Sequence, residues 1–542
     1  MLTTTGLQKS ASPQKSLAPS SSLKTLLRFI TCGSVDDGKS TLIGRMLYDA
    51  KLIADDQLET LVSESKKHGT DDGRLDFSLL VDGLAAEREQ GITIDVAYRY
   101  FSTPNRSFIV ADTPGHEQYT RNMATGASTA DLAVLLIDAR KGLLTQTRRH
   151  SLIVSMLGVK HVVLAVNKMD LVDFSPFIFN AIEAEFRTFS ENLGFESIAC
   201  IPVSARGGDN IVNPSHNMAW YKDAQLLDYL ENIDVSAPIN ATKFRLPVQW
   251  VNRPNLDFRG FSGFIAGGSV QVGDRIKVQP SGMESTVKSI VTYDGELQSA
   301  RAGQSITLTL TSEIDISRGD VITGIEQPPI VSSALKARLL WLGNQPLAAG
   351  KVYMLKIGAR TVLATISEPE SAIDINTGTT HAQPSLALNE IGLARISLDR
   401  AITFDLYKDN RETGGFILID RITNDTVAVG LIEATASISD VKQGSGYPTD
   451  AASLGSLEGI EAPQGGLAAL ITDPKDKPWR SFAKAISWRI TGSIDTFVIA
   501  YLFSGNVKLA ASIGATEIVT KIILYYFHER IWGRLKLGIK RD

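Results

Sequence analysis

The segment that most constrains the fold is a glycine-rich stretch that fits the pattern G-x-x-x-x-G-K-[ST]. It follows an apolar run, Leu27 to Thr31, and precedes Thr41-Leu42-Ile43, where we expect a helix to begin. A strand, a glycine-rich turn and a helix in this order predict a phosphate-binding loop, because glycines let backbone N–H groups wrap phosphate oxygens. The residues of the loop are Gly33, Ser34, Val35, Asp36, Asp37, Gly38, Lys39 and Ser40.

The last residues of this loop have predictable roles. Lys39 supplies a point charge to the β and γ phosphates of a nucleotide, and the Ser40 hydroxyl coordinates magnesium. We expect nucleotide contacts from every residue of the loop and from Thr41. Mg²⁺ is therefore an expected cofactor.

The chain around the loop alternates short apolar runs with helical stretches. The runs at 108–111, 132–137 and 162–166 are continuously apolar. Continuous apolar strands are typical of a parallel sheet that helices cover on both faces. We therefore expect a doubly wound, mostly parallel α/β nucleotide-binding domain over residues 23–235.

A second group of candidate residues follows the run at 108–111. Asp112 stands where a strand should end and is expected to hold magnesium through water. Gly115 can offer its backbone N–H to the γ-phosphate. A D-x-P-G turn alone is common at the end of a strand, but the upstream loop favours a nucleotide site.

The choice of base is predicted by two further segments. Asn167, Lys168 and Asp170 fit N-K-x-D after the run at 162–166. The Asp170 carboxylate can accept from the N1–H and 2-amino groups of guanine, whereas adenine has an acceptor at N1 and no 2-amino group. Asn167 would brace the site, and the Lys168 stem would lie over the base.

Ser204 and Ala205 follow the strand expected at 199–203, and a backbone N–H there would meet the guanine 6-oxo group. All of these elements stand at carboxyl ends of predicted strands, where a doubly wound sheet binds its ligand. Their order and spacing select GTP over ATP.

Beyond the α/β region the texture changes to short alternating segments with glycine turns, which predict antiparallel β-barrels. We expect one barrel over 240–328 and another over 335–435. Residues 1–22, without an apolar core for a secretory signal, are expected to be a flexible tail. A stretch rich in Gly, Ser, Pro and Ala at 440–473 predicts a linker before a last module at 474–542.

These motifs resemble the elongation-factor-like translational GTPases, in which the same loop, a G-I-T-I segment and a D-x-P-G-H element recur. Here the G-I-T-I segment lies within Glu87 to Ile94. The resemblance implies that Thr93 completes the magnesium shell and that His116 positions the attacking water. From the residues alone, Thr93 would be a β-branched residue in a strand and His116 an exposed loop histidine.

Three longer sequence segments narrow the resemblance to one branch of these GTPases. They are GSVDDGKSTLIGR, DGL before Glu87, and DTPGHEQYTRNMATGAS from Asp112 to Ser128. They resemble the large, GTPase subunit of bacterial sulfate adenylyltransferase over about residues 23–435. Translation factors usually carry His where this loop has Asp37. The resemblance implies a heteromeric enzyme that makes adenosine 5'-phosphosulfate and pyrophosphate from ATP and sulfate, driven by GTP hydrolysis. It also implies a separate small subunit with the adenylylating site.

The last module departs from that family. Two apolar stretches, Ile490 to Phe503 and Val507 to Phe527, predict a helical hairpin with basic residues at its ends. Asp495, Glu517 and Lys521 interrupt them. A soluble or partner-bound helical pair and a two-helix membrane module both stay open.

The words KAISWR at 484–489 and YYFHER at 525–530 resemble a small uncharacterised bacterial membrane-domain family. This resemblance implies membrane contact through residues 475–542, at the inner face of the cytoplasmic membrane.

Charge and cysteine content limit the location and the partners. From Lys475 onward the chain has 12 Lys and Arg against 5 Asp and Glu, but 43 against 54 before it. The acidic body argues against a nucleic-acid partner. Cys32 and Cys200 lack the spacing of a disulfide framework or a zinc site, which suits the reducing cytoplasm.

Two alternative functions remain at this point. A translational carrier would hold aminoacylated RNA on the β domains, and binding of charged tRNA would reveal it. A membrane-tethered signalling GTPase would need residues 475–542 for its activity toward partners.

Overall fold

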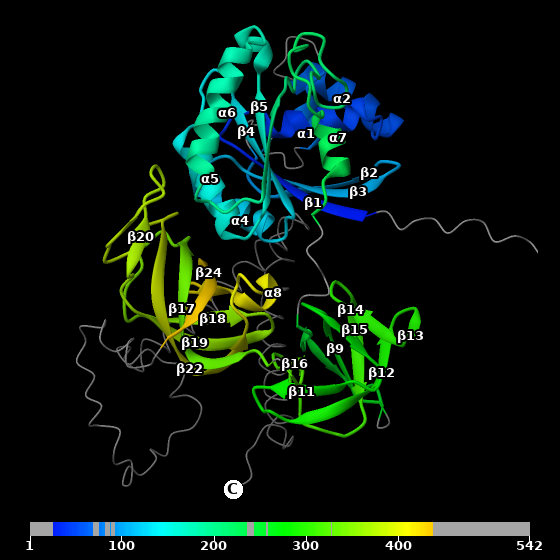
Figure 1. Ribbon diagram of the computed structural model, residues 1–542, viewed down its shortest axis with the longest axis vertical. Helices are drawn as coiled ribbons and strands as arrows, with labels where there is room; N and C mark the ends of the chain where they lie inside the picture. Colours follow the sequence, from blue (N-terminus) through cyan, green and yellow to red (C-terminus); the bar gives the residue numbers. More distant parts are fainter. Residues whose placement is uncertain are drawn as a thin grey trace, which may run out of the picture. The chain divides into compact units, whose positions relative to one another are not determined.

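The structure is a computed structural model. It describes residues 25–68, 75–81, 87, 93–235, 243–255, 258–326 and 328–436. These residues belong to one compact unit, Met1–Pro448, and form an α/β domain and two antiparallel β-barrels (Figure 1). The expected tail, linker and C-terminal helical hairpin lie outside the described residues.

The α/β domain is built on one six-stranded sheet of order β2-β3-β1-β4-β5-β6. All neighbouring strands run parallel except β2, which is antiparallel to β3. The expected mostly parallel sheet is therefore confirmed. The strands are β1 (Thr25–Cys32), β2 (Ala97–Ser102), β3 (Arg106–Asp112), β4 (Leu132–Asp138), β5 (His161–Asn167) and β6 (Ser197–Pro202).

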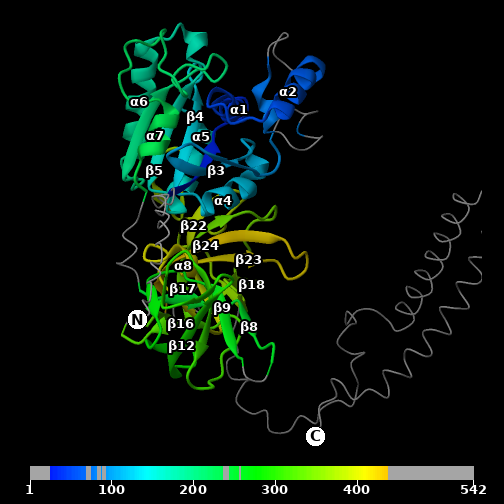
Figure 2. The same ribbon diagram turned by 90° about the vertical axis from the view of Figure 1, so that its right-hand side faces the viewer.

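Helices cover both faces of this sheet. Helices α4, α5 and α6 lie on one face and α1 and α7 on the other (Figure 1). Helix α2 lies farther from the sheet than α1 (Figure 2). The helices are α1 (Lys39–Asp49), α2 (Asp55–His68), α4 (Thr120–Ser128), α5 (Thr145–Met156), α6 (Pro176–Ser190) and α7 (Leu226–Asn232), with short 3₁₀ turns η1 (Phe77–Leu80), η2 (Glu117–Tyr119) and η3 (Met169–Val172).

Strand β4 shows why the sheet is covered on both sides. All seven of its residues are buried. Val134 and Leu136 pack with α1 and α7, whereas Leu135 and Ile137 pack with α4, α5 and α6. Since side chains alternate along a strand, only a continuously apolar run can fill both cores.

The sheet also fixes where its ligand site opens. Strand β1 has β3 on one side and β4 on the other. A cleft forms at such a switch point, outside the carboxyl ends of the strands. The phosphate-binding loop connects β1 to α1 at this place.

The first barrel has the strand order β7-β16-β11-β12-β15-β9-β8. Strands β7 and β8 are successive parts of one segment, so the pairing of β7 with β16 and of β8 with β9 closes the barrel. Its strands are β7 (Arg245–Pro247), β8 (Trp250–Asn252), β9 (Gly260–Phe264), β11 (Arg275–Gln279), β12 (Glu284–Thr292), β15 (Ser305–Leu310) and β16 (Val321–Gly324), with β13 (Gly295–Leu297) on β12 and a separate pair, β10 (Ser269–Gln271) and β14 (Ser299–Arg301).

The second barrel closes through the long strands β17 and β22, which pair with each other at the two ends of the path β17-β24-β23-β18-β19-β22. The expected fold class is confirmed for the described residues, while the expected domain boundaries stay predictions. The elements are β17 (Ile330–Trp341), β18 (Val352–Ile357), β19 (Arg360–Ile366), β20 (Ser371–Ile373), β21 (Thr380–His381), β22 (Ile391–Phe404), α8 (Arg411–Gly414), β23 (Gly415–Ile419) and β24 (Thr426–Thr435).

The second barrel packs directly on the α/β domain. Leu340 and Leu342 belong to the same buried cluster as residues of α4 and α5. The Tyr407 hydroxyl donates to the Leu157 carbonyl at 2.9 Å, and Arg411 donates to the carbonyl of Ser128 at 3.0 Å. Within the described part of the chain, no helix has the length and hydropathy needed to cross a membrane.

Candidate functional site

The phosphate-binding loop ends at Gly38, where it packs closely against Asn167. Gly38 caps α1 with φ of 90°, a left-handed conformation that glycine adopts at little cost. A Cβ at Gly38 would lie 2.5 Å from the Asn167 Nδ2. The loop and the strand end that carries Asn167 therefore touch only because residue 38 has no side chain.

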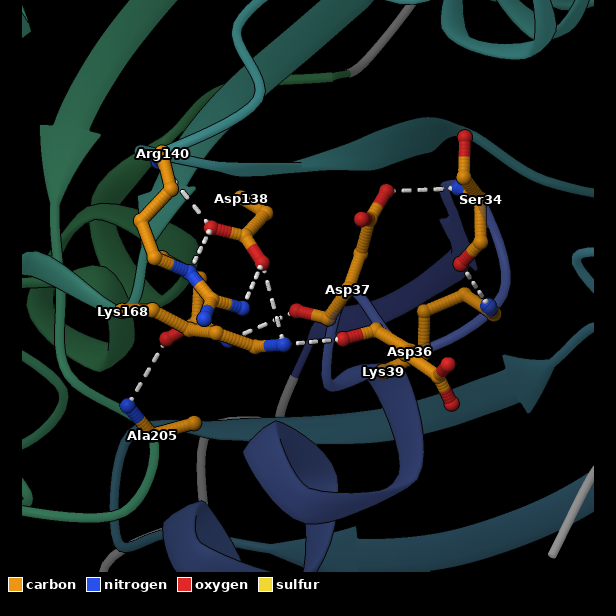
Figure 3. A network of polar contacts seen from close by, with 9 residues as sticks. Ser34, Asp36, Asp37, Lys39, Asp138, Arg140, Lys168 and Ala205 are labelled. Carbon is orange, nitrogen blue, oxygen red and sulfur yellow. Dashed lines mark hydrogen bonds and ion pairs between the residues drawn. The ribbon is translucent and has the colours of Figure 1, made fainter. Parts of the chain in front are cut away.

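Lys39 lies inside this loop. Its side chain is buried, and Nζ donates to the Ser34 carbonyl at 2.8 Å (Figure 3). It also donates to the Gly33 carbonyl at 3.3 Å. Burial lowers the pKa of Lys39, while the Asp112 and Asp37 carboxylates oppose that shift. The loop thus holds an ammonium group in a confined, polar cradle.

Asp37 is a second ionisable group in the loop. Its Oδ2 accepts the backbone N–H of Ser34 at 2.6 Å, and its side chain is 1% exposed. Among the described residues, Oδ1 has no hydrogen-bond partner. Burial raises the pKa of Asp37 to about 6, against the opposing charge of Lys39.

Ser40, Thr93 and Asp112 come together beside the loop, although they are far apart in the sequence. The Ser40 hydroxyl donates to Asp112 Oδ2 at 2.6 Å and lies 3.3 Å from the Thr93 hydroxyl. Thr31 donates to the other Asp112 oxygen at 2.7 Å. Asp112 is fully buried, and burial raises its pKa against these hydrogen bonds.

These groups form a set of hard oxygen donors, which Mg²⁺ prefers. The described residues contain no cluster of three or more His, Cys, Asp or Glu side chains that would hold a metal. A site with one carboxylate and two hydroxyls fits an ion that takes its other ligands from phosphate and water. Thr93 itself lies in an irregular segment before β2, not in a strand as its residue type alone suggested.

Gly115 and His116 differ in how they meet the loop. A Cβ at Gly115 would lie 2.7 Å from both the Gly33 carbonyl and the Lys39 Nζ, so the Gly115 backbone touches the loop. His116 is exposed, and its Nδ1 accepts the Gln118 N–H at 3.3 Å. Its ring centroid lies 5.9 Å from that of Tyr119.

The segments expected to choose the base meet in a pocket of about 250 Å³. Asn167 joins its parts, because its Nδ2 donates to the Asp37 carbonyl at 2.7 Å and its Oδ1 accepts the Ala205 N–H at 2.9 Å. The Ser204 hydroxyl donates to Asp170 at 2.7 Å. The pocket is lined by Gly38, Thr41, Leu75, Asp76, Phe77, Asn167, Lys168, Asp170, Leu171, Ala205 and Arg206.

Sequence reasoning missed the network that holds Lys168 over this pocket. Lys168 Nζ donates to the Asp36 carbonyl and lies 3.1 Å from Asp138 Oδ2 (Figure 3). Arg140 also donates to Asp138, at 2.6 and 3.0 Å. Burial alone would raise the pKa of Asp138, but hydrogen bonds from Arg140 and Lys168 outweigh it and lower the pKa. The available signal was an Asp at the end of an apolar strand, as at Asp112.

Leu75, Asp76, Phe77 and Arg206 were also missed. They line the pocket from outside the recognised motifs. No local pattern marks Leu75, Asp76 and Phe77, because their role depends on how η1 and the residues before it pack against α1. There, a Cβ at Gly44 would lie 2.0 Å from the Phe77 carbonyl.

Three family models match the chain. The elongation factor Tu GTP binding domain matches residues 24–236, and the GTP-eEF1A C-terminal domain-like family matches residues 334–433. A family described as predicted membrane protein (DUF2061) matches residues 482–533, outside the described part of the chain. The last match confirms the resemblance of the C-terminal module to an uncharacterised membrane-domain family.

Individual relatives are similar over most of the chain. Sulfate adenylyltransferase subunit 1 of Aeromonas salmonicida is 56% identical over 409 residues, covering 76% of this chain and 87% of that protein. The protein of the same name from Methylorubrum extorquens is 56% identical over 418 residues, covering 77% and 89%. The bifunctional enzyme NodQ of a Rhizobium species is 54% identical over 427 residues, covering 77% and 66%. The chain therefore belongs to the sulfate adenylyltransferase subunit 1 family and carries a GTP-binding domain of the elongation factor Tu type.

Proposed function

We propose that this chain is the GTP-hydrolysing subunit of a heteromeric sulfate adenylyltransferase. In this enzyme, GTP hydrolysis drives the formation of adenosine 5'-phosphosulfate and pyrophosphate from ATP and sulfate. The observation that carries the proposal is the meeting of three groups at one edge of the sheet, in a chain of this family. They are the Lys39 loop, the Ser40–Thr93–Asp112 oxygens and the Asp170 pocket.

The loop binds the triphosphate. Lys39 Nζ donates to two neutral carbonyls, those of Gly33 and Ser34. Phosphate oxygens carry a negative charge, so they attract the Lys39 ammonium more strongly than neutral carbonyl oxygens do. The β and γ phosphates are therefore better acceptors for Lys39, and the loop N–H groups from Gly33 to Thr41 surround them.

Ser40, Thr93 and Asp112 hold Mg²⁺, with Asp112 acting through water. A bound Mg²⁺ neutralises charge on the β and γ phosphates. Thr31 donates to one Asp112 oxygen and so orients the carboxylate. Thr93 reaches the cluster through its hydroxyl, which links the segment before β2 to the metal site.

The pocket binds guanine. The Asp170 carboxylate accepts from the N1–H and 2-amino groups of guanine. The Ser204 hydroxyl donates to Asp170 Oδ1 and so orients this carboxylate. Lys168, tied to Asp36 and Asp138, lays its stem along the pocket. The Ala205 N–H donates to Asn167 Oδ1. When guanine is bound, this N–H is shared between Asn167 Oδ1 and the guanine 6-oxo group.

His116 positions the water that attacks the γ-phosphate. Its place in the chain supports this role, because it directly follows the Gly115 backbone that touches the loop. A positioned water needs no covalent chemistry from the protein. The backbone N–H of Gln118, in η2, donates to His116 Nδ1 and so orients the ring.

A separate small subunit carries the adenylylating site and receives ATP and sulfate. Membership in a family named as subunit 1 supports a partner subunit. The complex works in the cytoplasm, with membrane contact through residues 475–542. The match of residues 482–533 to a predicted membrane protein family supports that contact.

The test is pyrophosphate release from ATP and sulfate by the full chain with its small subunit, with and without GTP. We expect GTP to stimulate release and Lys39→Ala to abolish the stimulation. Lys160→Ala, on an exposed lysine of the same domain, is the matched control and should behave as wild type. GTP turnover without any product from ATP and sulfate would refute the proposal.

A further inference from the structure

Asn389 of the second barrel has a backbone conformation that residues other than glycine rarely adopt. Its φ is 66°, and the residue is 4% exposed. Asparagine tolerates this region better than most residues, yet glycine adopts it without cost. Strained residues of this kind cluster at functional sites. A side chain kept at such a position needs a reason beyond the turn itself.

The side chain of Asn389 leaves its barrel and reaches the α/β domain. Its Nδ2 donates to the Glu117 carbonyl at 2.8 Å, which also accepts the Thr120 hydroxyl at 2.7 Å from within its own segment. Its Oδ1 is buried and has no hydrogen-bond partner among the described residues. Exchanging the two atoms would set oxygen against oxygen, so the carbonyl fixes the orientation of the amide. The fold tolerates an unsatisfied oxygen in order to make this one contact.

The segment that Asn389 holds begins directly after His116. Glu117 opens η2, and the same segment is held at further points. Arg149 of α5 contacts the Glu117 carboxylate at 3.3 Å. Arg121 donates to the Leu342 carbonyl of the second barrel at 3.2 Å. The residues after His116 are therefore fixed between α5 and the barrel.

We propose that Asn389 is a positioning residue for GTP hydrolysis, because its amide holds the Glu117 carbonyl and thereby sets the place of His116 at the phosphate-binding loop. The inference rests on the proposed function of His116. It makes the second barrel part of the hydrolytic machinery, through one hydrogen bond between residues 272 positions apart.

The decisive variant is Asn389→Gly in the full chain with its small subunit. Glycine accepts a φ of 66°, so the turn is preserved while the amide is lost. We expect kcat for GTP hydrolysis to fall by about three- to tenfold, as the loss of one hydrogen bond predicts. The Kd for GTP should stay within about twofold, and Tm should change little, because relief of the backbone strain offsets the lost hydrogen bond.

Two further variants sharpen the result. Asn389→Asp sets a carboxylate against the Glu117 carbonyl and should lower kcat more than glycine does. Asn424→Gly is the matched control, since Asn424 is an exposed asparagine of the same barrel with φ of 60°. It should leave hydrolysis unchanged.

The outcomes separate the possible explanations. A wild-type rate in Asn389→Gly overturns the inference and leaves the proposed function intact. A rate loss accompanied by weaker GTP binding and lower Tm also overturns it, because the defect would then lie in folding. A wild-type chain that binds GTP without hydrolysing it refutes the proposed function and the inference together.

Discussion

At the scale of single residues, the phosphate-binding loop contains a buried carboxyl group whose titration can be tested. Asp37 is almost completely buried, and its Oδ2 accepts the Ser34 N–H. Its pKa of about 6 lies above the ordinary 3.8. The folded state therefore binds the Asp37 proton more tightly than the unfolded chain does.

This shift predicts the pH dependence of stability without nucleotide. The contribution of Asp37 is fully present below about pH 4 and is lost as pH rises through about 6. Two pKa units correspond to about 3 kcal/mol. Asp37→Asn stays neutral, so the free energy of unfolding of wild type minus that of the variant should fall between pH 4 and 7. Urea unfolding across this range measures it, and parallel curves would contradict the prediction.

Asp170 gives a second prediction at this scale. Asp170→Ala removes the acceptor for two guanine donors, and each hydrogen bond to a charged group contributes about 1.5–3 kcal/mol. GTP binding should weaken by about 100-fold or more, as measured by calorimetry. Asp223→Ala, at an exposed carboxylate of the same domain, should leave the Kd unchanged. Equal losses in both variants would argue against the guanine contact.

At the scale of elements, the sequence predicts strands and turns whose formation depends on neighbouring residues in the chain. The apolar runs of β1, β3, β4 and β5 are visible in the sequence because both faces of the sheet are buried. The loop at Gly38 is visible because its glycines are required. Phe77 and Asn389 are not visible, since their contacts depend on packing between segments remote in sequence. Thr93 was identified through family resemblance, and its place beside Ser40 comes from the fold.

The segment before β2 carries a prediction of its own. Glu87 is 3% exposed, and its Oε1 accepts the backbone N–H groups of Ile94 at 3.0 Å and Asp95 at 3.2 Å. Ile94 and Asp95 directly follow Thr93 in the chain, so these two bonds hold the backbone beside it. Glu87→Ala should therefore let the Thr93 hydroxyl move away from the metal site. The Mg²⁺ concentration for half-maximal GTP hydrolysis should rise by about tenfold or more, because both hydrogen bonds to the carboxylate are lost. Glu87→Gln keeps an acceptor oxygen and should be close to wild type; equal defects in both variants would point to charge instead.

At the scale of the whole described unit, the two barrels are joined by an ion pair between a buried guanidinium and a largely buried carboxylate. Arg245 of β7 is 1% exposed and donates to both Asp405 oxygens, at 2.8 and 2.9 Å. Thr413 donates to the same carboxylate at 2.8 Å. The pair connects the first barrel to the second barrel, which contacts the α/β domain. Its loss should therefore affect the stability of the whole unit and not of one barrel alone.

Removing Asp405 from this pair leaves the buried Arg245 guanidinium without its counter-charge. Asp405→Ala should lower the free energy of unfolding by about 3–5 kcal/mol, whereas replacing both partners by apolar residues of similar volume is often neutral. The double variant Arg245→Met with Asp405→Leu should therefore recover most of the loss, as measured by denaturant unfolding of both variants. Recovery shows that the penalty comes from the uncompensated guanidinium and not from lost packing. If the double variant is as unstable as Asp405→Ala, the hydrogen bonds of the pair themselves hold the barrels together.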